Sequence, residues 1–76
     1  MLGKRKVVRL RIKLTRHAKE RMINRGLTIE QIKRAIRMGA RIKQTDGYES
    51  SYTYFIVDWK KIGEDVYKIK TIKIKD

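Results

Sequence analysis

The feature that most limits the fold is a change of hydrophobic period along the chain. In residues 7–14, VVRLRIKL, apolar and basic residues alternate strictly, which predicts a strand with one buried face. Between residues 15 and 38 the apolar residues recur at helical spacing instead, and after Gly39 the alternation returns. The pattern therefore predicts helices between strands, which excludes an all-helical or an all-strand domain.

Two helices are predicted before Gly39. The first is expected to begin after an N-cap at Thr15 and to run to about Asn24, because Gly26 then follows as the residue that enters the left-handed region cheaply. The second is expected to begin after Thr28, since Thr28 and Gln31 have the spacing of a capping box.

The alternating stretches after Gly39 predict three strands joined by turns. They are residues 40–45 (ARIKQT), 50–59 (SSYTYFIVDW) and 66–75 (VYKIKTIKIK). In the last stretch the alternation slips, so either both of its faces are covered or a β-bulge lies near Thr71. We therefore predict an α+β fold of order β-α-α-β-β-β, with two helices packed on one face of an antiparallel sheet, in a single domain of residues 1–76.

Charge and composition limit the classes of function that the chain can have. The chain has 76 residues, no cysteine, one histidine and a net charge of +13. Residues 1–38 carry 13 basic and 2 acidic side chains, whereas residues 39–76 carry 8 and 6. This asymmetry predicts a basic face whose natural partner is nucleic acid. We expect no metal and no cofactor, because thiolate ligands are absent, and the lack of a long apolar run indicates a cytoplasmic protein without a membrane segment.

The single histidine, His17, lies among cations in the segment TRHAKER. The partial positive charge of a helix N-terminus and the neighbouring cations both disfavour a further positive charge, so we expect a neutral ring that can act as a general base. The alternative is a surface histidine with no catalytic or binding role. Arg21 and Arg25 follow at four-residue spacing, where guanidinium groups could hold a phosphate, although a solvated helix face would look the same.

RNA is the substrate that needs only such groups, because its 2′-hydroxyl is an internal nucleophile. Lys70, Tyr67 and Tyr54 are candidate general acids, and the sequence does not choose among them. The expected contacts to nucleic acid, RNA rather than DNA, come from basic residues and from two tyrosines that could stack on bases: Arg9, Arg11, Lys13, Arg16, Lys19, Lys33, Arg37, Lys70, Tyr52 and Tyr54. The alternative function is non-catalytic binding, in which the first strand and the helices form a ribbon-helix-helix unit or the domain is a general RNA binder.

Residues 16–39, RHAKERMINRGLTIEQIKRAIRMG, resemble the opening of domain-of-unknown-function family 4258. The signature of that family is His-Ala-x-x-Arg-Met-x-x-Arg-Gly, and His17, Arg21 and Arg25 occupy its positions. The resemblance implies kinship with metal-independent ribonuclease toxins of the RelE and colicin type, which are often silenced by an acidic antitoxin protein. It also implies that His17, Arg21 and Arg25 form the active site together with Thr71, which matches a last-strand Ile-x-Thr pattern.

Overall fold

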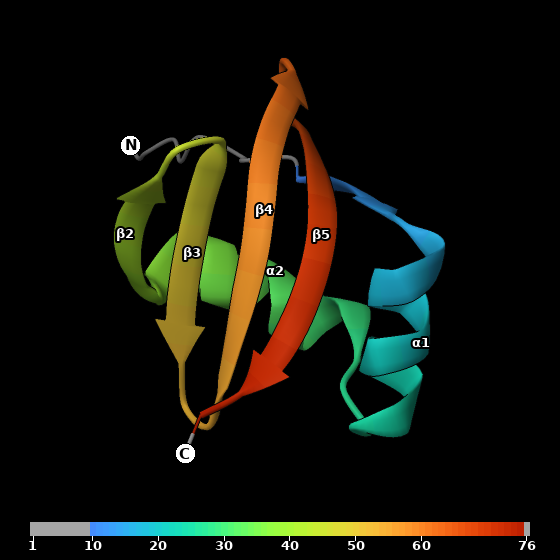
Figure 1. Ribbon diagram of the computed structural model, residues 1–76. Coiled ribbons are helices and arrows are strands. Elements are labelled where there is room, and N and C mark those ends of the chain that lie inside the picture. Colours follow the sequence, from blue (N-terminus) through green and yellow to red (C-terminus); the bar gives the residue numbers. More distant parts are fainter. Residues whose placement is uncertain (1–9, 76) are drawn as a thin grey trace, which may run out of the picture.

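The computed structural model describes residues 10–75, in which two helices contact a five-stranded sheet (Figure 1). The predicted α+β class is confirmed. In chain order the elements are β1 (Arg11–Leu14), α1 (Arg16–Asn24), α2 (Ile29–Met38), β2 (Ala40–Gln44), β3 (Gly47–Tyr52), β4 (Phe55–Gly63) and β5 (Val66–Ile74). The strands lie in the order β1-β5-β4-β3-β2 across the sheet. Arg9 and the start of the predicted strand 7–14 lie outside the described residues.

The sheet is mixed rather than wholly antiparallel. The pairings of β2 with β3, β3 with β4 and β4 with β5 are antiparallel as predicted, but β1 runs parallel to β5, with Leu14 opposite Ile69. Three tight turns reverse the chain between β2 and β5, and the two helices connect β1 to β2 at the opposite edge of the sheet. The connection between the parallel partners β1 and β5 therefore contains both helices and the three strands β2, β3 and β4. The first and last strands of the described chain are therefore neighbours in space.

The predicted strand 50–59 is wrong, because the chain turns back at Thr53 and Tyr54 and forms the two strands β3 and β4. Thr53 adopts a positive φ of 47°, and Tyr52 pairs with Phe55 across this two-residue turn. A threonine at positive φ is rare, and the segment contains none of the glycine or asparagine that ordinarily marks such a turn. The order after the helices consequently contains four strands instead of three.

Both helices begin where the capping residues predict. The Thr15 side chain accepts a hydrogen bond from the Ala18 amide at 3.0 Å, and Thr28 forms both halves of the capping box with Gln31. Gly39 ends α2 in an extended conformation, and a Cβ there would lie 2.5 Å from the carbonyl oxygen of Ala35. Glycine is therefore needed at this position for close packing rather than for a left-handed turn.

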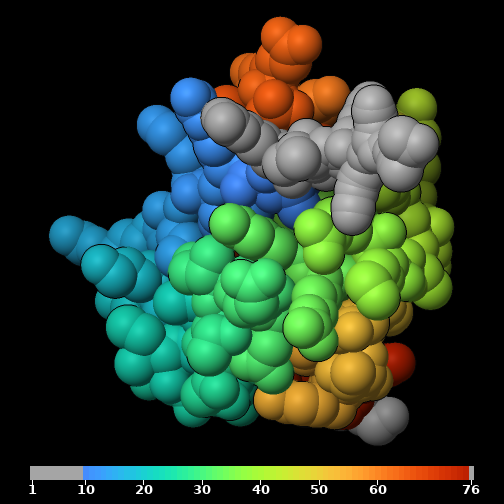
Figure 2. Space-filling model, turned by 180° about the vertical axis from the view of Figure 1, so that it is seen from behind, coloured from blue at the N-terminus to red at the C-terminus, as the bar shows by residue number. Residues whose placement is uncertain are grey.

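The core lies between α1, α2 and one face of the sheet. Trp59 is buried within it, and its indole nitrogen donates a hydrogen bond of 2.8 Å to Ser50, the buried polar side chain. From behind, side chains of α1 and α2 cover much of this face of the molecule (Figure 2). No helix within residues 10–75 is long and apolar enough to span a membrane. The buried apolar residues of the core are Ala18, Leu27, Ile32, Ala35, Ile36, Phe55, Val57, Trp59, Ile69 and Ile72.

The opposite side of the sheet, which we call the open face, carries mostly charged side chains. It is formed by the residues that alternate with the core residues along the strands. Lysines dominate it near β1 and β5, and carboxylates lie on β3 and β4. Its charged residues are Arg11, Lys13, Lys60, Lys68, Lys73, Glu49 and Asp58.

Candidate nucleic-acid interface

The N-terminus of α1 is anchored to the middle of β5. The amide of Thr15 donates to the carbonyl oxygen of Ile69 at 3.3 Å, and the Thr15 hydroxyl donates to the carbonyl oxygen of Lys70, also at 3.3 Å. The same hydroxyl accepts from Ala18 as the helix cap. One residue thus fixes the start of the helix, and with it His17 two residues later, against the last strand.

The predicted bulge near Thr71 is confirmed, and it lies at this anchor. Asp58 on β4 pairs with Thr71, and the next residue, Trp59, pairs with Ile69, which leaves Lys70 as the extra residue of β5. The bulge shifts the alternation of the strand, so that Ile69 and Ile72 are both buried in the core. The Thr15 hydroxyl donates to the carbonyl oxygen of Lys70, the extra residue of this bulge.

His17 and the two arginines lie on and just beyond α1. His17 is exposed and Arg21 is half-buried. Because four residues separate them on the helix, the two lie about 40° apart around its axis. Arg25 is exposed but is the C-cap, with φ −94° and ψ 0°, and its amide donates to the carbonyl oxygen of Arg21. The expected row of three side chains is therefore a pair on the helix followed by an arginine at its end.

The other basic residues predicted to contact nucleic acid are spread over β1, α1, α2 and β5. Arg11 and Lys13 on β1, Arg16 and Lys19 on α1 and Arg37 on α2 are exposed, and Lys33 on α2 is half-buried. Lys70 lies at the bulge and contacts Asp46, through both the carbonyl and the carboxylate of that residue.

The ion pairs are confined to one part of the molecule. Within residues 10–75, carboxylates form ion pairs with Lys60, Lys70 and Lys73, all on β4 and β5. No cation of β1, α1 or α2 has an ion pair in that range. These side chains can therefore receive an external polyanion without first breaking an internal contact.

The two tyrosines expected to stack on bases do not share a strand face. The turn at Thr53 separates them, so that Tyr52 packs against the core beside Phe55, whereas Tyr54 is 48% exposed in the turn itself. Tyr48, Trp59 and Tyr67 likewise form an aromatic group on the core side. The guanidinium of Arg41 covers the Tyr48 and Trp59 rings at 5.5 and 5.1 Å. The aromatic residues therefore serve mainly packing, as core residues usually do.

An acidic cluster on the open face was not predicted. Glu49 and Asp58 lie opposite each other on β3 and β4, and the Lys73 ammonium contacts both, at 3.1 and 3.7 Å. Burial raises the pKa of the Asp58 carboxyl above its ordinary value of 3.8, an effect that Lys73 opposes and Glu49 reinforces. Only a correct prediction of the turn between β3 and β4 would have paired these two carboxylates.

Together the fold and the charge distribution define a small basic α+β domain in which the cations of β1, α1 and α2 form no ion pair within residues 10–75. The chain belongs to the family described as a domain of unknown function (DUF4258), whose model matches residues 14–73. The match therefore includes His17, both arginines, the bulge and Thr71. No curated protein and no solved structure is significantly similar to the chain.

Proposed function

We propose that the domain binds single-stranded RNA and cleaves it without a metal ion, as small ribonuclease toxins do. The observation that carries this proposal is the exposed imidazole of His17, set among cations that form no ion pair within residues 10–75. Such a surface attracts the phosphate backbone, and it presents one imidazole, a side chain type that often serves as a general base. Arg21 is the phosphate ligand favoured by position, because it follows His17 by one helical turn.

The chemistry follows from the 2′-hydroxyl of RNA. His17 removes the 2′-hydroxyl proton, the 2′-oxygen attacks phosphorus, and Arg21 and Arg25 stabilise the charge on the phosphorane. The bond to the 5′-oxygen then breaks, leaving a 2′,3′-cyclic phosphate and a protonated 5′-hydroxyl. Lys70 is the favoured proton donor, because it lies at the bulge beside Thr71, and it would have to leave its contact with Asp46 to act. Tyr67 packs against the core and Tyr54 lies in the β3–β4 turn.

Non-catalytic binding of nucleic acid is the second candidate. One observation favours it: within residues 10–75, the structure gives His17 no hydrogen bond to a third group that would orient the imidazole, as general bases usually have. Exposed Arg11 and Lys13 also suit binding alone. A ribbon-helix-helix arrangement would use β1 to pair with a second copy, whereas here β1 pairs with β5 of its own chain. An acidic antitoxin protein would fit the same cations as RNA does.

The deciding experiment compares the parent protein with His17→Ala on a labelled single-stranded RNA, in the presence of a chelator. We expect the cleavage rate to fall by at least about 100-fold, with a nearly unchanged Kd and a cyclic phosphate on the product of the parent. Asn24→Ala is the matched control, because Asn24 is an exposed polar residue of the same helix. A substrate methylated at each 2′-oxygen should resist cleavage. If His17→Ala cleaves as fast as the parent, or if neither cleaves while both bind, the catalytic proposal is wrong.

A further inference from the structure

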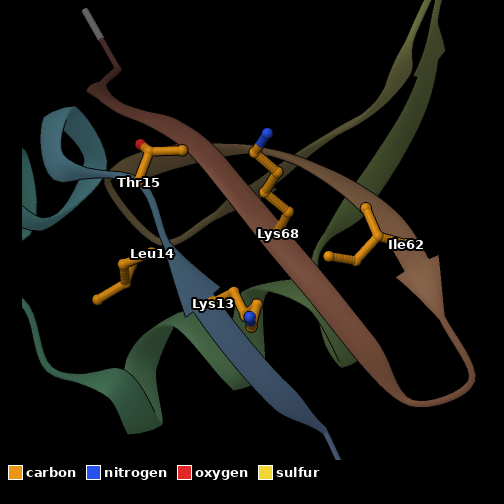
Figure 3. A pocket seen from close by; sticks show the side chains of 5 residues that line it. All are labelled: Lys13, Leu14, Thr15, Ile62 and Lys68. Atoms are coloured by element: carbon orange, nitrogen blue, oxygen red, sulfur yellow. The ribbon is translucent and has the colours of Figure 1, made fainter.

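The open face contains a pocket of about 320 Å³ between β1, β5 and the end of β4 (Figure 3). Its lining residues come from three separate segments: Lys13, Leu14 and Thr15 from the end of β1 and the helix cap, Ile62 from β4, and Lys68 from β5. The volume falls at the lower end of the range for small-molecule sites, which is about 300–1,000 Å³. Thr15 is also the residue that anchors α1, so the pocket adjoins the start of the helix that carries His17.

Two lysines of this pocket lie directly opposite each other. Lys13 and Lys68 are register partners in the parallel pairing of β1 with β5, and Lys60 is the partner of Lys68 on the other side. Lys60 is neutralised by Asp46 at 2.9 Å, whereas Lys13 and Lys68 have no ion pair within residues 10–75. Like charges at opposed positions destabilise a sheet. A bound anion between the two ammonium groups would remove that cost.

The pocket also has an apolar side. Ile62 is the extra residue at the second irregularity of the β4–β5 pairing, between Lys61 and Gly63, and its side chain is 48% exposed. The aliphatic stems of Lys13 and Lys68 add further apolar surface while their charged ends reach solvent. An apolar wall beside paired cations matches a nucleotide, which has a base or ribose face next to a phosphate, better than it matches a bare phosphate ion.

We propose that this pocket receives one nucleotide of a single-stranded RNA, with its phosphate between Lys13 and Lys68 and its base or ribose against Ile62. The proposal rests on the proposed function and adds a location for the substrate, because Thr15 lines the pocket and lies two residues before the exposed His17. It also explains why two unpaired lysines lie opposite each other, because a bound phosphate would relieve the repulsion between their ammonium groups.

The first test measures the affinity of a labelled single-stranded RNA as a function of salt. We expect Lys13→Gln and Lys68→Gln each to weaken binding by about 3- to 10-fold and to lower the salt slope by about 0.7, the value for one phosphate contact on a single strand. Lys43→Gln is the matched control, because Lys43 is an exposed strand lysine that does not line the pocket. Equal effects of all three substitutions would show that only overall charge matters, and would overturn the proposal.

The second test separates a nucleotide from a simple phosphate. Ile62→Ser should weaken RNA binding without changing the salt slope, and a nucleoside monophosphate should compete better than inorganic phosphate. If Ile62→Ser binds as the parent does, or if the two competitors are equal, the pocket takes phosphate only and the nucleotide assignment is wrong. Without RNA, Lys13→Gln and Lys68→Gln should melt at or above the temperature of the parent, which also shows that the variants fold.

Steady-state cleavage kinetics can test the pocket proposal separately from the proposed function. We expect the lysine variants to raise KM with little change in kcat, whereas His17→Ala lowers kcat. If the lysine variants bind and cleave as the parent does while His17→Ala is inactive, the pocket proposal fails and the proposed function stands. If the lysine variants weaken binding but no variant or parent cleaves, the pocket is a binding site of a non-catalytic domain.

Discussion

The Thr15 hydroxyl joins the first turn of α1 to the bulged residue of β5, donating to the Lys70 carbonyl oxygen while accepting from the Ala18 amide. This contact spans 55 residues of sequence. Together with the hydrogen bond from the Thr15 amide to the Ile69 carbonyl oxygen, it links the segment that carries His17 to the strand that carries Thr71.

Thr15→Val keeps the shape of the side chain but removes both hydrogen bonds. We expect the free energy of unfolding to fall by about 0.5–2 kcal/mol, the usual cost of losing an N-cap. We also expect RNA cleavage to fall tenfold or more, because the start of α1 loses its side-chain hydrogen bond to the bulge and keeps only the backbone one to Ile69. Denaturant unfolding and single-turnover cleavage measure the two effects.

Thr28→Val provides the control for that substitution, because Thr28 caps α2 with the same geometry but lies in an exposed position away from the bulge. It should cost a similar amount of stability and leave cleavage unchanged. A Thr28→Val protein that lost activity in parallel with Thr15→Val would show that activity follows stability alone.

The pH dependence of stability should distinguish two aspartates. Because burial raises the pKa of Asp58 above 3.8, the folded state holds this proton more tightly than the unfolded chain does. The resulting stability is present below about pH 3.8 and is lost as pH rises through the raised pKa. Asp58→Asn should therefore gain stability relative to the parent between about pH 3 and pH 7, as thermal melting would show.

Asp46 should behave in the opposite way. A hydrogen bond and the charge of Lys60 hold its pKa below 3.8, so its contribution is present above about pH 3.8 and is lost as pH falls through the lowered pKa. Asp46→Asn should lose stability relative to the parent over the same rise in pH. Profiles of the same sign for the two variants would contradict the environments described for these carboxylates.

Replacing the strained residue in the turn between β3 and β4 should not destabilise the protein. Thr53 is β-branched and has a φ of 47°, a conformation that glycine adopts without a steric cost. We expect Thr53→Gly to leave stability unchanged or to raise it by up to about 1 kcal/mol, measured by chemical denaturation. At Thr45, a turn residue without positive φ, the same substitution should lower stability, and equal losses at both positions would argue against strain at Thr53.

Local signals in the sequence predict the helices, and they fail for part of the sheet. Thr15, Thr28 and Gln31 predict the helix starts because capping depends on neighbouring residues only. The slip of alternation predicts either a β-bulge near Thr71 or a strand covered on both faces, and the structure contains the bulge. The turn at Thr53 has no glycine or asparagine to mark it, so the sequence does not predict the β3–β4 hairpin. Without that hairpin, the pairing of Glu49 with Asp58 cannot be predicted either.

The surface around His17 is predicted in part. The sequence indicates which cations lie near His17 in the chain, and in the structure Arg16, Lys19 and Arg25 are exposed while Arg21 is half-buried. It does not indicate that Lys13 would lie opposite Lys68. The parallel pairing of β1 with β5 joins strands that are far apart in the sequence and depends on the arrangement of the whole sheet. Pockets formed by strands far apart in sequence cannot be read from any one segment.

The pairing of β1 with β5 has a consequence for synthesis of the chain. Residues 66–74 supply the neighbour of β1 and the carbonyl groups that Thr15 binds, so the segment carrying His17 has no anchor until those residues have been made. Contacts between distant segments form slowly, because the intervening chain must close first. A domain of this topology that attacks RNA would therefore stay inert while it emerges from the ribosome, and would spare the message that encodes it.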